Sequence, residues 1–479
     1  MGPQTHLDRL SSVDASFLSN ETSNSHMHVG AVLIFEGPPP HYDDLLDHVR
    51  SRLEQVPRFR QKLVFPPLEA GRPLWADDPA FNLTYHLRHT ALPSPGSEEQ
   101  LRKLTGRVFS QQLDRSKPLW ELWLVQGFER DRFVILTKTH HALVDGISGV
   151  DIATVLFDIK PSPEPAEQIA QWAPGAEPST PHLLARAATE AAATPLRLAG
   201  RLATAVQHPG PTAHRAREAL EGLGELAWAL ANPAPDVPLN VENGPHRRFA
   251  WVRSELATFK QIKDGLGGTV NDVVLAVVSG GLRHWLRRRG VKTEGLELRA
   301  LVPVSIRAED ERGQLGNRIA AMRGPLPVYV DDPVRRLQIV REAMEGLKQS
   351  KQALGAEVIS RFNDFAPPTL LAQASRINFS TRLFNLIVTN VPGPQIPLYV
   401  LGRELQEVFP VAFLPENHAL AVAIMSYYGR INFGLLADYD ALEDVDAICA
   451  GIGRSISELV EAAGQREPQS EATESAPAG

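Results

Sequence analysis

The sequence contains very little cysteine, since Cys449 is the single one among 479 residues. One thiol excludes an intramolecular disulfide and a cysteine-based zinc site, and it suits a reducing cytosol. The sequence also lacks the run of about 18 apolar residues that a membrane-spanning helix needs; a long apolar stretch such as Ala419–Met425 has only seven. The N-terminal segment Met1–His6 has no signal-peptide layout. We therefore expect a cytoplasmic protein that is soluble or peripheral to a membrane.

An excess of positive charge is also absent. Lysine and arginine number 49 against 56 aspartate and glutamate residues, which gives a formal net charge of −7. Proteins that bind nucleic acid through its phosphates usually have a basic balance, so we expect no nucleic-acid partner. Hydrophobic residues at 43% and charged residues at 22% are typical of a globular protein.

Proline marks the predicted domain boundaries. Residues 161–245 hold 13 of the 38 prolines, and Ala/Leu/Arg-rich stretches of helical composition lie between them. We predict an N-terminal domain over 1–160, a Pro/Ala-rich helical linker over 161–245 and a C-terminal domain over 246–464. Residues 465–479 contain no aromatic or branched aliphatic residue, which predicts a disordered tail.

Both predicted domains mix helix and strand signals. Strands are expected over Val29–Phe35, Leu119–Val125, Leu298–Val304, Leu383–Thr389, His418–Tyr427 and Ile431–Asp438. Helices are expected over Tyr42–Gln55 and over Thr269–Arg288, the second one buried and capped by Asn271. The pattern indicates an α/β protein with two layered halves of similar size.

One segment, Arg132–Gly149, contains several residues whose side chains are suited to catalysis. Phe133–Ala142 is rich in β-branched and apolar residues and predicts a strand, and Asp145-Gly146 predicts a turn before a helix. His140 and His141 therefore lie at the end of a strand. Strand alternation places His141 on the face of Thr137 and Thr139, and it places His140 on the opposite face.

The two histidines are not expected to bind a metal, because adjacent strand residues point apart and no HExxH spacing is present. An imidazole can transfer a proton near neutral pH, and Asp145 could orient it or the loop. The alternative is two histidines that are satisfied by backbone hydrogen bonds at a strand end. The pair alone does not decide between these interpretations.

The segment His140–Gly146 matches the HHxxxDG signature, and the chain resembles the CoA-dependent acyltransferase superfamily that carries it. Within that superfamily it is similar to the bacterial wax ester synthase/acyl-CoA:diacylglycerol acyltransferases. The further blocks that carry this resemblance are Leu10–Phe17, Met27–Gly30, Leu113–Glu121, Asn271–Ala276, Val302–Arg307, Gly316-Asn317, and Asn390–Pro394 with Pro397–Tyr399. Thr389 departs from the family pattern, which has serine there, but it retains a hydroxyl.

The resemblance implies two chloramphenicol-acetyltransferase-like α/β sandwich domains joined by a helical, Pro-rich linker. It implies acyl transfer from acyl-CoA, as a co-substrate, to diacylglycerol or a long-chain alcohol, with no cofactor and no metal. The products would be triacylglycerol, wax ester or both. Because these substrates dissolve poorly in water, we expect peripheral contact with the inner face of the membrane or with lipid inclusions.

The resemblance also implies roles for individual residues. His141 would be the general base, with His140 and Gly146 in the same motif and Asp145 orienting the loop by pairing with Arg307. The supporting residues would be Asn271, Asp272, Thr389 and Asn390. Thr389, Asn390 or Ser426 could supply the hydrogen bond that stabilises the oxyanion.

Two alternatives stay open. A related condensation-type enzyme would take its acyl group from a carrier protein, although the sequence has no adjoining carrier module. A non-catalytic lipid-binding scaffold would not need both His141 and Asp145.

Overall fold

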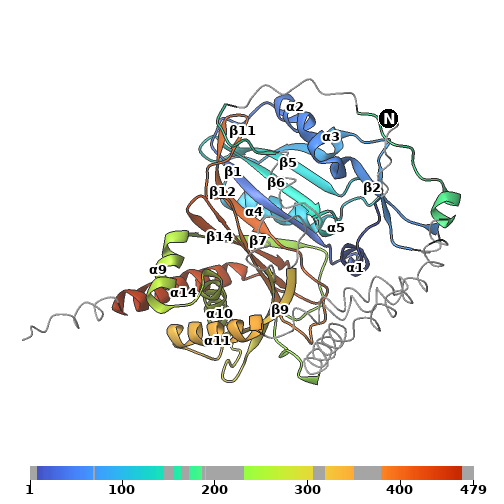
Figure 1. The fold of residues 1–479 in the computed structure, drawn as a ribbon. Helices are drawn as coiled ribbons and strands as arrows, with labels where there is room; N and C mark the ends of the chain where they lie inside the picture. The colour runs from blue at the N-terminus through green and yellow to red at the C-terminus, as the bar shows by residue number, and fades with distance from the viewer. Residues whose placement is uncertain are drawn as a thin grey trace, which may run out of the picture.

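Two six-stranded sheets form the molecule, one above the other in Figure 1. The computed structural model describes residues 8–67, 71–144, 156–162, 172–185, 189, 231–305, 319–349 and 379–466. Most of the predicted linker, over 163–171 and 190–230, therefore lies outside the described residues. The α/β class and the two halves of similar size are as predicted.

The first sheet has the strand order β11-β12-β1-β6-β5-β4. Its strands are β1 (His28–Phe35), β4 (Leu87–Ala91), β5 (Trp120–Phe128), β6 (Arg132–His140), β11 (Tyr399–Val400) and β12 (Arg403–Val411). β1 pairs antiparallel with β12, from Gly30 opposite Val411 onward. Two strands of the first sheet thus come from the C-terminal part of the chain, so sheet membership does not follow the predicted boundary between 1–160 and 246–464. A short hairpin, β2 (Gln61–Val64) and β3 (Leu74–Asp77), stands apart.

The second sheet has the order β7-β14-β13-β10-β8-β9. Its strands are β7 (Arg247–Glu255), β8 (Leu298–Ser305), β9 (Ile319–Leu326), β10 (Leu386–Pro392), β13 (Leu420–Tyr427) and β14 (Arg430–Asp438). β10 runs parallel to both β8 and β13. The strands predicted in this half are present. The one predicted over Leu383–Thr389 is shifted to begin at Leu386 and to continue through Pro392.

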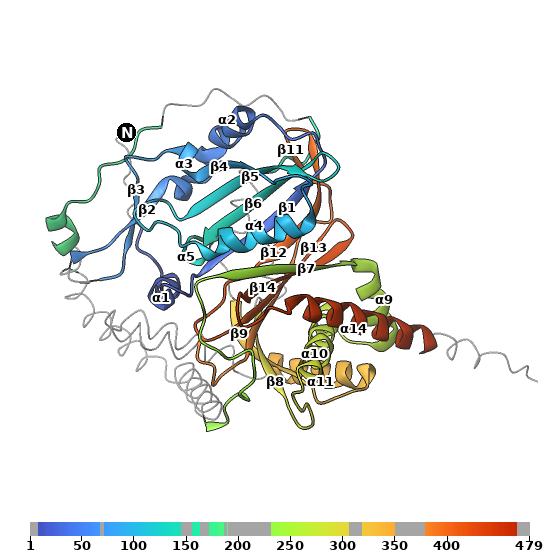
Figure 2. The same cartoon turned by 180° about the vertical axis from the view of Figure 1, so that it is seen from behind.

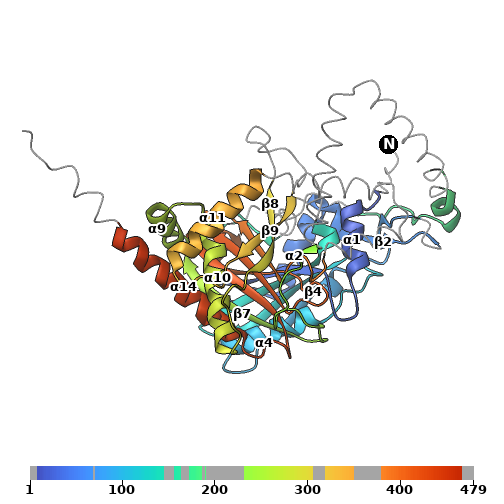
Figure 3. The same cartoon turned by 90° about the horizontal axis from the view of Figure 1, so that it is seen from below.

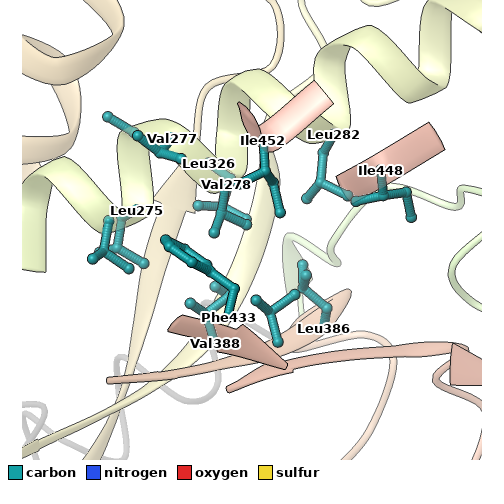
Figure 4. Close-up of a cluster of buried hydrophobic side chains, with 14 of the residues drawn as sticks. Leu275, Val277, Val278, Leu282, Leu326, Leu386, Val388, Phe433, Ile448 and Ile452 are labelled. Carbon is teal, nitrogen blue, oxygen red and sulfur yellow. The ribbon is translucent and has the colours of Figure 1, made fainter. Parts of the chain in front are cut away.

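Four helices pack on the second sheet and are grouped together in Figure 3. They are α9 (Leu256–Leu266), α10 (Val270–Arg288), α11 (Pro333–Gln349) and α14 (Val445–Arg466). α10 is buried on nearly all sides, as predicted, because it lies between the sheet and α14. In Figure 4, Val278 and Leu282 of α10 point toward Phe433 of the sheet and Ile452 of α14. α14 continues through Arg466 and so includes the first two residues of the predicted tail.

The N-terminal cap of α10 differs from the prediction. Thr269, not Asn271, is the cap: its hydroxyl accepts a hydrogen bond from the backbone N–H of Asp272. The Asp272 carboxylate in turn accepts from the Thr269 backbone N–H at 2.8 Å. This reciprocal pair is a capping box, which satisfies backbone donors at the helix start. The assignment of Asn271 as the cap was therefore wrong, and its side chain is left for another contact.

In the first half, helices cover both faces of the sheet. The helices of this half include α1 (Ser12–Asn20), α2 (Tyr42–Arg52), α3 (Leu83–His86) and α4 (Glu98–Ser110), together with two 3₁₀ turns, η1 (Leu53–Gln55) and η2 (Pro57–Arg60). α1, α2 and α3 contribute to a core on one face. α4 lies on the other face, beside β7 of the second half (Figure 2). No single helix among these described elements is long and apolar enough to cross a membrane. Only α9 and α10 taken together have that length and composition, and the pair is bent by 99°.

A third core joins the two sheets. It combines Leu136 and Phe409 of the first sheet with Trp251 and Ile387 of the second. At Gly434 of β14 a Cβ would lie 1.8 Å from the backbone oxygen of Pro410, so only glycine allows β12 and β14 to approach this closely. The two halves are thus packed directly on each other.

Candidate active site at the end of strand β6

The chain leaves the sheet between the two histidines. β6 ends at His140, which is paired with His28 of β1. His141 begins the four-residue helix α5 (His141–Val144), and its backbone N–H donates to the carbonyl of Met27 at 2.8 Å. The predicted strand over Phe133–Ala142 is therefore two residues too long. The predicted placement of His141 on the strand face of Thr137 and Thr139 was wrong, because strand alternation stops at His140.

The half-buried side chain of His141 lies among aromatic rings from both halves of the chain. Phe17 of α1 stacks on the imidazole with ring centroids 3.9 Å apart and planes 23° apart. Phe413, which follows β12, meets it edge-on at 5.5 Å. Phe413 belongs to the core between the two sheets, and Phe17, which is partly buried, packs against that core. His141 therefore sits at the junction of the two halves and has an apolar ring against one face.

His140 faces inward and is completely buried. Its Nδ1 accepts a hydrogen bond from the backbone N–H of Ala142 at 3.0 Å. Its Nε2 lies 3.4 Å from a carboxylate oxygen of Glu21. A backbone hydrogen bond at the strand end was one of the two interpretations of the histidine pair, but the carboxylate partner was not predicted.

Glu21 is the residue that sequence reasoning missed. Its side chain is 1% exposed, and it contacts His140, His28 at 3.3 Å and the Arg115 guanidinium at 2.9 Å. Burial alone would raise the pKa of the Glu21 carboxyl, but the contacts with His140 and His28 bring this pKa well below its usual range. Burial lowers the pKa of His28 well below its usual value. One signal could have pointed to Glu21: it is the only acidic residue between Asp14 and Glu36.

The supporting residues from the second half form a second group. The Asn390 side-chain amide of β10 donates to the Asn271 side-chain oxygen at 3.4 Å, so these two predicted residues are brought together. Asp272 serves in the capping box of α10. Thr389 is half-buried beside Asn390 on the same strand. Ser426 accepts a hydrogen bond from the backbone N–H of Gly393 at 3.3 Å, at the end of β10.

Three predicted residues, Asp145, Gly146 and Arg307, lie outside the described residues, so their roles stay predictions. The Asn390–Pro394 block, which its composition predicts to be a turn, is strand through Pro392. No group of three or more histidine, cysteine or carboxylate side chains that could hold a metal occurs within the described part of the chain.

Comparison with known families identifies two matching domains. The wax ester synthase/diacylglycerol acyltransferase catalytic domain matches residues 10–274, and the C-terminal domain of the same family matches residues 315–460. A protein of Mycobacterium tuberculosis strain H37Rv, named a probable diacyglycerol O-acyltransferase, is 32% identical over 461 residues. That alignment covers 95% of this chain and 96% of the relative.

A solved structure leads to the same family. The wax ester synthase/diacylglycerol acyltransferase from Marinobacter aquaeolei VT8 superposes with a TM-score of 0.66 at 27% identity, over 95% of this chain and all of that one. The first condensation domain of the CDA synthetase, at 15% identity and a TM-score of 0.56 over 96% of both chains, shares the fold. The chain therefore belongs to the wax ester synthase/diacylglycerol acyltransferase family.

Proposed function

We propose that this acyltransferase moves a long-chain acyl group from acyl-CoA to the hydroxyl of diacylglycerol, of a long-chain alcohol, or of both. The products are triacylglycerol and wax ester. The observation that carries the proposal is the position of His141, which α5 presents at the junction of the two halves between Phe17 and Phe413. A histidine in such an apolar setting is suited to proton transfer between two substrates.

His141 acts as the general base in this proposal. Its neutral imidazole takes the proton of the acceptor hydroxyl while the hydroxyl oxygen attacks the thioester carbonyl. The tetrahedral intermediate then collapses, the carbon–sulfur bond breaks, and the departing CoA sulfur receives the proton from the imidazolium. The products are an ester and free CoA, and His141 returns to its neutral form. Such proton transfer supplies about 10²–10⁴-fold in rate.

In this proposal, the aromatic rings of Phe17 and Phe413 beside His141 limit hydrolysis of the thioester. Water competes with the alcohol for the thioester, and attack by water would release a fatty acid instead of an ester. Phe17 covers one face of the imidazole at 3.9 Å and itself packs against the core between the sheets. It therefore limits the approach of water to the base while the alcohol enters along the remaining side.

The other predicted residues support this base. The proposal keeps the roles that the resemblance implies for Asp145, Gly146 and Arg307, which lie outside the described residues. Asn271 and Asn390 brace the second half through their 3.4 Å contact. Thr389, Asn390 or Ser426 supplies the hydrogen bond to the oxyanion. Ser426 and Asn390 already have partners within the protein, whereas no hydrogen bond of the Thr389 hydroxyl is present among the described residues, which favours Thr389.

The chemistry of the substrates suggests where the enzyme works. Diacylglycerol and both products are insoluble in water, so we propose peripheral attachment of a cytoplasmic enzyme to the membrane or to lipid inclusions. The stretch His182–Arg217 carries five arginines and one glutamate, a composition suited to an anionic surface. Flotation with anionic liposomes tests this idea. Unchanged binding after Arg→Glu substitutions at 197, 201 and 215 would contradict it.

A product assay tests the proposed function. The purified chain is incubated with labelled palmitoyl-CoA and either dioleoylglycerol, hexadecanol or no acceptor, and the lipids are separated. We expect labelled triacylglycerol, wax ester or both, with little free palmitate when no acceptor is added. Release of palmitate at the same rate in all three reactions would identify a thioesterase instead. No product from palmitoyl-CoA but transfer from a carrier-bound acyl group would favour the condensation-type alternative.

A further inference from the structure

A buried carboxylate connects the helix that carries Phe17 to the histidine that precedes His141. Glu21 directly follows α1, and its side chain is 1% exposed. One of its oxygens lies 3.4 Å from Nε2 of His140, and the other lies 3.3 Å from Nε2 of His28. We infer that Glu21 is a positioning residue for His141, acting through the ring of His140; this role rests on the proposed function of His141 as the base.

The first step in the argument is the tautomer of His140. Its Nδ1 accepts the backbone N–H of Ala142 at 3.0 Å. An imidazole nitrogen that accepts a hydrogen bond carries no proton, so the neutral ring must have its proton on Nε2. That nitrogen faces the Glu21 carboxylate, which can only accept when ionised. The carboxylate therefore selects the tautomer in which Nδ1 is free to accept.

The second step is the effect of this ring on α5. His140 precedes the first residue of α5, and the Ala142 N–H is one of the donors that have no partner within a helix at its start. The His140 ring thus caps α5 as an aspartate or serine side chain would. His141 is the first residue of that short helix, so its position depends on the cap. A rotated or differently protonated His140 would release the turn that presents His141.

The third step is the anchoring of Glu21 itself. Arg115 donates to it from Nε at 2.9 Å and from Nη2 at 2.5 Å, and Arg115 also donates to the Leu18 carbonyl of α1 at 2.9 Å. Both contacts go to Oε2, the oxygen that also faces His140, so the guanidinium holds that oxygen in place. Because α1 also carries Phe17, the same anchor holds both the ring stacked on His141 and the acceptor that orients His140.

The matched control is Glu121, a second buried glutamate of the first half. It is 6% exposed and pairs with Arg88 at 2.8 Å, as Glu21 pairs with Arg115. Its other partner is the indole N–H of Trp123 at 3.0 Å, and it makes no contact with His140 in the described part of the chain. Glu121→Gln removes the same charge from a comparable site without touching the cap of α5.

The experiment measures kcat, KM for palmitoyl-CoA and melting temperature for Glu21→Gln, Glu21→Asp and Glu121→Gln. We expect Glu21→Gln to lower kcat about 10- to 100-fold with little change in KM, because a displacement of about 1 Å can cost about 10²-fold. Glu21→Asp should recover part of kcat, since a carboxylate again faces His140. Glu121→Gln should lower the melting temperature but keep kcat near wild type. Equal effects of Glu21→Gln and Glu121→Gln on kcat would overturn the inference.

A second readout does not depend on acyl transfer. In protein labelled with ¹⁵N-histidine, nitrogen chemical shifts report which ring nitrogen carries the proton, and the His140 signals are assigned by their loss in His140→Gln. We expect the Nε2–H tautomer in the wild-type protein and a mixture of tautomers in Glu21→Gln. An Nδ1–H tautomer in the wild type would overturn the inference even if acyl transfer is confirmed. The expected tautomers without any acyl transfer would instead contradict the proposed function.

Discussion

At the scale of single residues, the two adjacent histidines have different environments because the backbone changes direction between them. His140 is the last residue of β6 and is buried against Glu21, whereas His141 starts α5 and packs between Phe17 and Phe413. The sequence predicted that the two side chains differ. It did not predict Glu21, because a contact between residues more than one hundred positions apart leaves no local pattern.

The stacking of Phe17 on His141 leads to a prediction about water. Phe17→Ala removes the ring that covers the imidazole, so water gains access to the base and to the thioester. We expect release of CoA without an acceptor to rise relative to ester formation, measured as free thiol against labelled product. Phe65→Ala is the control, because Phe65 is exposed at the surface and its loss should leave this ratio unchanged. An unchanged ratio in Phe17→Ala would show that this ring does not limit hydrolysis.

At the scale of elements, the helices and strands that the sequence predicted are present, but several of their ends lie elsewhere. Tyr42–Gln55 is present as α2 followed by η1, and Thr269–Arg288 as α10. Alternation and helical spacing depend on burial of one face, so they locate an element well. Its ends depend on caps and turns of a few residues. For this reason the sequence predicted Asn271 instead of Thr269 as the cap of α10, and it predicted a strand that continues through Ala142 instead of ending at His140.

The capping box of α10 gives a test of this correction. We expect Thr269→Ala to lower the free energy of unfolding by about 1 kcal/mol, because it removes the side-chain acceptor of the Asp272 N–H. Asn271→Ala should change the free energy of unfolding much less. It should act instead on turnover, since it removes the contact with Asn390. Urea denaturation of both variants measures the difference, and a larger loss of stability in Asn271→Ala would restore Asn271 as the cap.

At the scale of the whole molecule, the contribution of two C-terminal strands to the first sheet could not be predicted from the sequence. β12 completes the first sheet by pairing with β1, although about 380 residues separate Gly30 from Val411. The alternation within each strand indicates which face is buried but not which strand lies beside it. The two halves, their α/β class and the location of the histidine pair at a strand end were all predictable from local pattern. Which strand lies beside which in each sheet could not be predicted from local pattern.

The stability of the whole molecule should also depend on acid. Burial lowers the pKa of His86 from 6.5 to about 4, and its Nδ1 lies 2.8 Å from the Trp120 carbonyl. Between pH 6.5 and pH 4 the unfolded chain therefore binds more protons at this residue than the folded one. The free energy of unfolding should fall as pH falls through that window.

His86→Gln tests this dependence, because glutamine does not titrate. We expect its melting temperature to fall less steeply between pH 6.5 and pH 4 than that of the wild type, even if it starts lower at pH 7. His182→Gln, at an exposed position, should follow the wild-type curve. Parallel curves for His86→Gln and the wild type would mean that His86 does not contribute to the acid response.

The most direct test of the central claim is ester formation from palmitoyl-CoA and dioleoylglycerol by the wild type, His141→Ala and His140→Ala, each with its melting temperature. We predict that His141→Ala loses about 10²–10⁴-fold in turnover with little change in melting temperature, because it removes the proton acceptor from a half-buried position. His140→Ala should have a lower melting temperature and a smaller loss of turnover, because it removes the buried cap of α5. Turnover near wild type in His141→Ala, with loss of turnover in His140→Ala, would contradict the assignment of His141 as the base.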